Sequence, residues 1–149
     1  MTNDVEASVP GPAPALGPVA RYGNTFQRFS LNALRIVTGL LFMQHGAQKL
    51  FAWFGREEPV ALVSQMGLAG VLEFFGGLMI VLGILTVPVA LILAVEMLWA
   101  YFQAHLPRGW VPIMNGGELS LLYAFIFIFL GANGGGSFSL DGWLKGRRG

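Results

Sequence analysis

The sequence predicts an all-α protein that crosses a membrane as an up-down-up-down bundle of four helices, with both termini in the cytoplasm. Of its 149 residues, 54% are hydrophobic and only 11% are charged, whereas a soluble domain carries about 25% charged residues. Four apolar stretches follow one another with short connections, as in an antiparallel bundle. Basic residues gather at the end that bears both termini. These observations exclude a soluble globular enzyme.

Residues 1–28 differ in composition from the rest of the chain. Their prolines lie among Ala, Gly and acidic residues, without apolar periodicity. Such a segment buries too little apolar surface to offset its ordering entropy, so a disordered Pro/Ala-rich tail is expected. No short apolar core opens the chain, which does not fit a signal peptide.

A transmembrane domain is expected over residues 29–144, followed by a basic tail at 145–149. Helices are expected because an open strand in lipid leaves backbone groups unpaired. The spans are predicted at 31–54, 67–86, 88–106 and 117–134. The first three approach the ~20 residues that cross the hydrocarbon layer, and the fourth is short. Pro88 suits the first turn of the third helix.

The basic residues predict the orientation. One end of the bundle has five of them and the opposite end has two, which places both termini in the cytoplasm. These residues are Arg21, Arg28, Lys145, Arg147 and Arg148 at the first end, and Arg56 and Arg108 at the other.

The first span carries an unusually polar stripe. Arg35, Thr38, Phe42, His45 and Lys49 are spaced by three or four residues, so they share one helical face. Ionisable side chains in a span cost several kcal/mol unless they are paired or hydrated, so this face is expected inside the bundle. Gln44 and Gln48 lie beside it.

Each of the other spans contributes an acid or a base. The rise of an α-helix places most of these groups in the outer half of the bundle, with Glu96 near mid-depth and Arg35 near the inner side. The groups expected to meet there are His45, Lys49, Glu73, His105 and Glu118, with Gln48 and Gln103 completing a polar network. Small residues that let helices approach closely are Gly39, Gly46, Gly76, Gly77 and Gly83.

Two interpretations of these charges remain open. In the first, the two cations within the spans face three glutamates. The charges then sum to zero only if one glutamate is protonated or His45 is charged, a condition that suits proton transfer. Alternatively, Lys49–Glu73 and Arg35–Glu96 are structural ion pairs and Glu118 lies at the headgroup boundary. A haem held by His45 and His105 is not expected, since His105 lies near a helix end.

The absence of cysteine narrows the chemistry. It excludes a thiolate nucleophile, a disulfide relay and an iron–sulfur cluster held by this chain. No metal site is expected, and the net charge of +1 gives no reason to expect nucleic-acid binding.

Seven short motifs lie at residues 34–39, 46–50, 73–78, 83–86, 115–119, 134–136 and 139–141. Together they resemble the motifs of the DoxX family of small four-helix inner-membrane proteins. The resemblance implies an oxidoreductase setting, because the family takes its name from a subunit linked to a terminal quinol oxidase. Related members are associated with thiosulfate:quinone oxidoreduction or with complexes that handle oxidative and thiol stress. The positions that carry over are Arg35, Gly39, Gly46, Lys49, Glu73, Gly76, Gly77 and Glu118.

Three functional hypotheses follow. The first is a membrane subunit of an oxidoreductase complex that binds a quinone, with Glu73, His45 and Lys49 binding its carbonyl oxygens and moving protons. Any sulfur chemistry is then performed by a partner protein. The second is an anchoring or assembly subunit of a larger membrane complex. The third is a small proton-coupled transporter, which would need water access from both sides.

Overall fold

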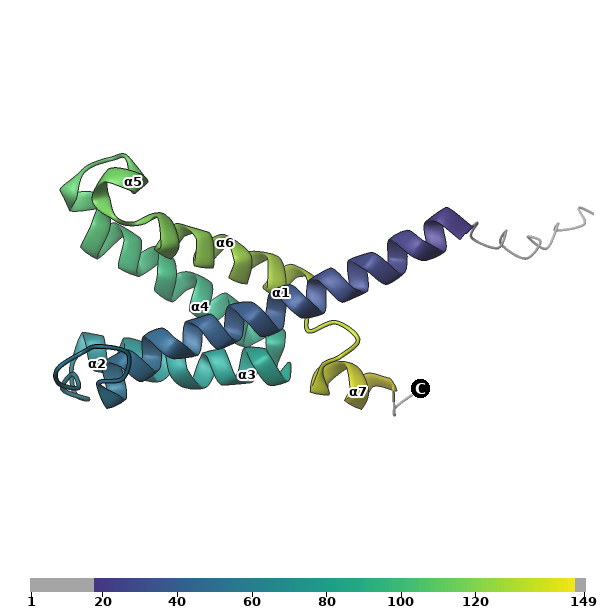
Figure 1. Ribbon diagram of the computed structural model, residues 1–149, viewed down its shortest axis with the longest axis horizontal. Coiled ribbons are helices and arrows are strands. Elements are labelled where there is room, and N and C mark those ends of the chain that lie inside the picture. The colour runs from purple at the N-terminus through teal and green to yellow at the C-terminus, as the bar shows by residue number, and fades with distance from the viewer. Residues whose placement is uncertain (1–17, 147–149) are drawn as a thin grey trace, which may run out of the picture.

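The computed structural model describes residues 18–146, and within that range it contains helices and no strands (Figure 1). This confirms the predicted all-α class. Two segments, η1 and η2, are π-helical turns, and η3 is a 3₁₀ turn. The elements are α1 (Pro18–Phe51), α2 (Gln65–Val71), η1 (Leu72–Gly76), α3 (Gly77–Leu82), α4 (Thr86–Ala100), η2 (Tyr101–His105), η3 (Leu106–Arg108), α5 (Pro112–Asn115), α6 (Glu118–Asn133) and α7 (Leu140–Gly146).

The long helical segments form two pairs. Helix α1 packs along the continuous segment α2–η1–α3, and α4 packs along α6. The pairs meet near the turn between α3 and α4 and diverge toward the end that bears α2 and α5 (Figure 1). The first turns of α1 and helix α7 lie toward the converging end (Figure 1).

Two of the described helical segments are long and apolar enough to cross a membrane. They are 65–82 and 86–108, which correspond to the predicted second and third spans. Helix α6 is equally apolar in character but has only 16 residues, fewer than the ~20 that cross the hydrocarbon layer.

The boundaries of the predicted tails are wrong where the structure describes them. Residues 18–28, predicted to be disordered, form the beginning of α1. Pro18 is accepted there because a proline in the first helical turn loses no intrahelical hydrogen bond, and no further proline interrupts the helix. Residues 145 and 146, assigned to the basic tail, belong to α7. The remaining tail residues, 1–17 and 147–149, lie outside the described range.

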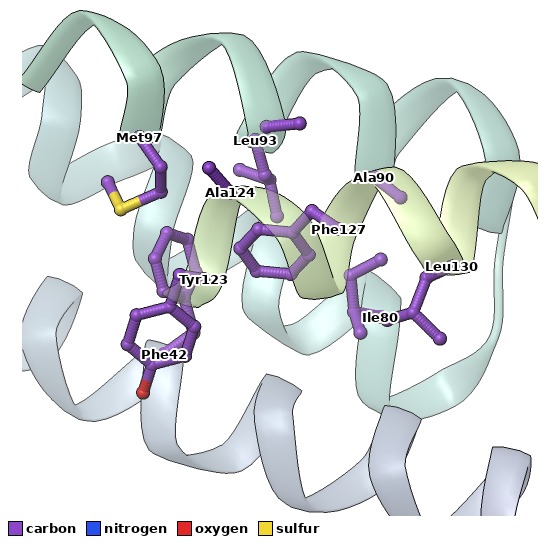
Figure 2. Packing of buried hydrophobic residues seen from close by; sticks show 10 residues of the cluster. Phe42, Ile80, Ala90, Leu93, Met97, Tyr123, Ala124, Phe127 and Leu130 are labelled. Atoms are coloured by element: carbon purple, nitrogen blue, oxygen red, sulfur yellow. The ribbon is translucent and has the colours of Figure 1, made fainter. Parts of the chain in front are cut away.

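Buried side chains from both pairs form one apolar core. Phe42 of α1 packs its ring against Tyr123 and Phe127 of α6, with centroid distances of 5.0 and 4.8 Å. Figure 2 shows these rings between the helices, with Ala90 and Ala124 where α4 approaches α6. The core therefore joins the two helix pairs.

The segment after α6 returns to close the turn between α3 and α4. The Asp141 carboxylate accepts hydrogen bonds from the backbone N–H groups of Leu85 and Thr86, at 2.9 and 2.8 Å. It thereby caps α4, since the N-cap residue Leu85 makes no side-chain cap. Gly83 ends α3 with a φ of +68°, a left-handed conformation that favours glycine.

Glycines allow α1 to approach the second helix closely. A Cβ atom on Gly39 would lie 2.8 Å from the carbonyl oxygen of Gly77, and one on Gly77 would lie 2.9 Å from that of Gly39. A Cβ atom on Gly46 would lie 2.3 Å from the backbone nitrogen of Phe74. On the other face of the second helix, a Cβ atom on Gly76 would meet Leu93 of α4 at 2.8 Å.

We therefore expect Gly46→Ala to lower the free energy of unfolding by about 1–3 kcal/mol, the usual cost of overpacking a rigid site. The obstructing atoms belong to the backbone of Gly70 in α2 and of Phe74 in η1. Phe74 directly follows Glu73, so its backbone cannot move without displacing that residue. Denaturation in detergent micelles measures the effect. Gly146→Ala is the matched control, because a Cβ atom there meets nothing within 4 Å. Equal stability of the two variants would contradict the close approach.

Candidate functional site

A cavity of about 380 Å³ lies where the two helix pairs diverge. Its wall draws on α1, on α2 and η1, on α4 and η2, and on α6, and most of it is apolar. The volume is within the range typical of small-molecule sites. Its acidic, basic and amide side chains are His45, Lys49, Gln65, Glu73, Glu96, Gln103 and His105.

One ion pair forms the polar wall of the first helix pair. Lys49, in the last turn of α1, donates hydrogen bonds from Nζ to both carboxylate oxygens of Glu73. The Glu73 side chain is 5% exposed and that of Lys49 is 15% exposed. Glu73 lies in the π-helical turn η1, and such turns are frequent at functional sites. Lys49 and Glu73, two of the three residues predicted to act on a ligand, thus form an ion pair.

Glu96 of α4 faces this ion pair from the second helix pair. It is close enough to Glu73 and Lys49 to interact with their charges. Both of its carboxyl oxygens are buried, and neither has a hydrogen-bond partner among residues 18–146. The cavity therefore contains one paired acid and one unpaired acid.

The predicted Arg35–Glu96 pair is wrong. Arg35 is fully buried and donates hydrogen bonds to the carbonyl oxygens of Ile80 and Phe138, at 2.5 and 2.6 Å, and to that of Val81. The last carbonyl groups of a helix lack the regular N–H partners four residues further on. The guanidinium supplies donors to two of them, and the Ile80 carbonyl also accepts from the N–H of Gly83 at 3.2 Å. Arg35 therefore closes the converging end of the molecule and does not line the cavity.

His45 lies between the cavity and a second groove. Its ring is perpendicular to that of Tyr123, with centroids 5.9 Å apart. Both side chains line the cavity and also a groove between α1 and α6 that contains Gln44 and Gln48. Gln48 donates a hydrogen bond to the carbonyl oxygen of Phe54 and does not reach the cavity.

Hydrogen bonds at the rim connect the cavity wall to the loops. Gln65 of α2 donates to the side-chain oxygen of Gln103 in η2, a contact that joins the two helix pairs. The Nδ1 atom of His105 lies 3.2 Å from the carbonyl oxygen of Asn115. Asn115 in turn donates to the carbonyl oxygen of Gly109 and accepts from the N–H of Gly117. This network fixes the loop over the cavity.

Glu118 does not join the group predicted to meet in the outer half. It is exposed at the start of α6 and lines a separate surface groove with Leu122 and Phe125. His45, Lys49, Glu73 and His105 do line one cavity, and Glu96 takes the place expected for Glu118.

Sequence reasoning missed two contributions of α6 to the site. Ser120 and Tyr123 line the cavity, and the Ser120 hydroxyl donates to the carbonyl oxygen of Met97 in α4 at 2.9 Å. Their three-residue spacing in an otherwise apolar helix could have indicated this face. Within residues 18–146, no group of three or more His, Asp or Glu side chains is arranged to hold a metal ion. The arrangement suits an apolar ligand with a few polar atoms.

Comparison with known proteins identifies a family and a relative. The family model described as DoxX matches residues 30–106. A protein of Haemophilus influenzae described as an uncharacterized protein is 36% identical over 127 residues, which cover 78% of this chain and 91% of that protein. No solved structure matches.

Proposed function

Since this chain belongs to the DoxX family, we propose that it is a multi-pass protein of the bacterial inner membrane that serves an oxidoreductase complex by binding a quinone. The unpaired acid beside the Lys49–Glu73 ion pair, in an otherwise apolar cavity, is the observation that carries this proposal. A quinone, when bound, carries two electrons and two protons on reduction to the quinol.

The membrane arrangement that we propose has four spans and cytoplasmic termini. Segments 65–82 and 86–108 have the length and hydropathy of spans, and α6 and the apolar part of α1 pack beside them. The first turns of α1 and helix α7 lie toward the same end, as an even number of crossings requires (Figure 1). The sequence has five basic residues beside the outer ends of the first and last proposed spans and two in the loops of the opposite side, which supports a cytoplasmic location of the termini.

The residues of the cavity fit a quinone head group. Its largely apolar wall suits a ring, and Lys49, Glu73 and Glu96 supply hydrogen-bonding groups on facing walls. His45 and Tyr123 adjoin the groove between α1 and α6, which offers an isoprenoid tail a route toward lipid. The chain has no cysteine, so any thiol or sulfur chemistry takes place on a partner protein, which also supplies the electrons.

An assembly subunit without a ligand is the second candidate. The close Lys49–Glu73 pair favours it, because structural pairs fix the register of helices. The buried carboxyl of Glu96 does not fit it, because a purely structural network would pair that group too. A transporter is less well supported, since Arg35 is held by backbone carbonyls at the converging end and offers no polar path there.

Quinone binding to the purified protein in lipid nanodiscs tests the proposal. We expect a short-chain benzoquinone to quench the fluorescence of Trp99, which lines the cavity. Ala100→Leu fills the cavity and should weaken binding at least about tenfold, which is about 1.4 kcal/mol. Ala132→Leu, at an exposed position of α6 outside the cavity, is the matched control.

Equal affinity of the two leucine variants would show that the quinone partitions into lipid and does not occupy the cavity. Absence of binding, combined with stoichiometric copurification in a larger complex, would support the assembly role instead.

A further inference from the structure

We propose that Glu96 carries a proton in the resting protein and presents its hydroxyl to the cavity, so that the cavity prefers a neutral ligand with carbonyl oxygens over the hydroxyl-bearing reduced form of the same ligand. The choice of ligand rests on the proposed quinone function. The protonation of Glu96 does not.

The first step is the isolation of the Glu96 carboxyl group. Both oxygens are buried without a hydrogen-bond partner among residues 18–146. An ionised carboxylate in such a place loses its hydration and gains no compensating hydrogen bond, which makes the ion costly. The neutral acid avoids that cost.

The second step concerns the groups that face Glu96. These are His45 and Lys49 on α1, Glu73 on η1, Tyr123 on α6 and His105 on η2. The charge of Lys49 acts on Glu96, and its ammonium group already binds both oxygens of Glu73. If Glu96 were ionised, its negative charge and that of Glu73 would share the single positive charge of Lys49. A proton on Glu96 leaves one negative charge, on Glu73, opposite the one positive charge of Lys49.

The third step counts hydrogen-bond donors. An ammonium group has three N–H bonds, and two of those of Lys49 point to Glu73. The third remains for a ligand, and a protonated Glu96 adds an O–H donor from the opposite helix pair. A dicarbonyl ring offers only acceptors and matches these donors. A dihydroxy ring brings its own donors and needs acceptors, which a protonated Glu96 supplies less well.

Infrared spectroscopy of the full chain in nanodiscs without quinone tests the protonation directly. We expect a carbonyl-stretch band of a protonated, buried carboxyl group at neutral pH, which Glu96→Gln removes. Glu118→Gln, at the exposed acid of α6, should leave the band unchanged. Persistence of the band in Glu96→Gln would assign the proton elsewhere and overturn the inference. Absence of the band from the wild-type protein would overturn it too.

Binding of the two redox forms of one short-chain benzoquinone tests the preference. The wild-type protein should bind the dicarbonyl form at least about tenfold more tightly than the dihydroxy form. Glu96→Gln presents both a donor and an acceptor, so the preference should fall toward equality. Raising the pH until the infrared band disappears should also abolish it.

The outcomes separate this inference from the proposed function. If neither form binds while the band depends on Glu96, the quinone function and the preference fail but the proton remains assigned. If both forms bind wild-type protein equally well, the quinone function stands and the preference is overturned.

Discussion

Arg35→Met is expected to lower the free energy of unfolding by about 3–5 kcal/mol, because it removes the charged donor of three hydrogen bonds that join the end of α3 to the segment after α6. The guanidinium is fully buried and bonds the carbonyl oxygens of Ile80, Val81 and Phe138, which belong to two separate segments. Denaturation in detergent micelles, followed by circular dichroism, measures the loss.

Two further variants make this result specific. Arg35→Lys should be intermediate, because a single ammonium group lacks the planar fork with which arginine bridges α3 and Phe138. Arg28→Met removes an exposed guanidinium from the same helix and should change stability little. A wild-type unfolding curve for Arg35→Met would contradict the proposed closing role.

Lys49→Met should cost a comparable 3–5 kcal/mol, about the usual penalty for removing one partner of a buried ion pair. Glu73 would then be a second buried acid without a partner, beside Glu96. The double variant Lys49→Met/Glu73→Gln should recover most of the loss, since it removes the stranded charge together with its partner. A double-mutant cycle of unfolding free energies measures this coupling.

The control for this cycle is Arg108→Met, which removes an exposed cation at the diverging end of the molecule. It should leave the stability of the protein and of the Glu73→Gln variant unchanged. Losses that simply add in the Lys49→Met/Glu73→Gln variant would contradict a direct ion pair.

The stripe on α1 was predictable because it depends only on helical spacing. Spacings of three and four residues place His45 and Lys49 on one face, and both line the cavity. The Lys49–Glu73 pair could be proposed from depth along the two helices, and the structure contains it. Such arguments succeed where helices are long and regular.

The partners of Arg35 could not be predicted, since they are backbone carbonyls and leave no mark in the sequence. Glu118 was placed wrongly because it begins a helix after an irregular loop, where the rotational phase of the helix is not fixed by earlier residues. The turns η1 and η2 also make it harder to predict which way the following side chains face, because a π-helical turn rotates them relative to a regular α-helix. The start of α1 was missed because a proline-rich composition does not show where the helix begins.

The closure at the turn between α3 and α4 also constrains how the protein is made. Phe138 and Asp141 follow every long helix within residues 18–146, yet they complete the contacts of Arg35 and of the first turn of α4. During translation, Arg35 leaves the ribosome about a hundred residues before Phe138 does. A nascent chain therefore lacks the contacts of Phe138 and Asp141 until synthesis has passed residue 141. We expect products that end before residue 138 to lack the contacts that close this end of the molecule.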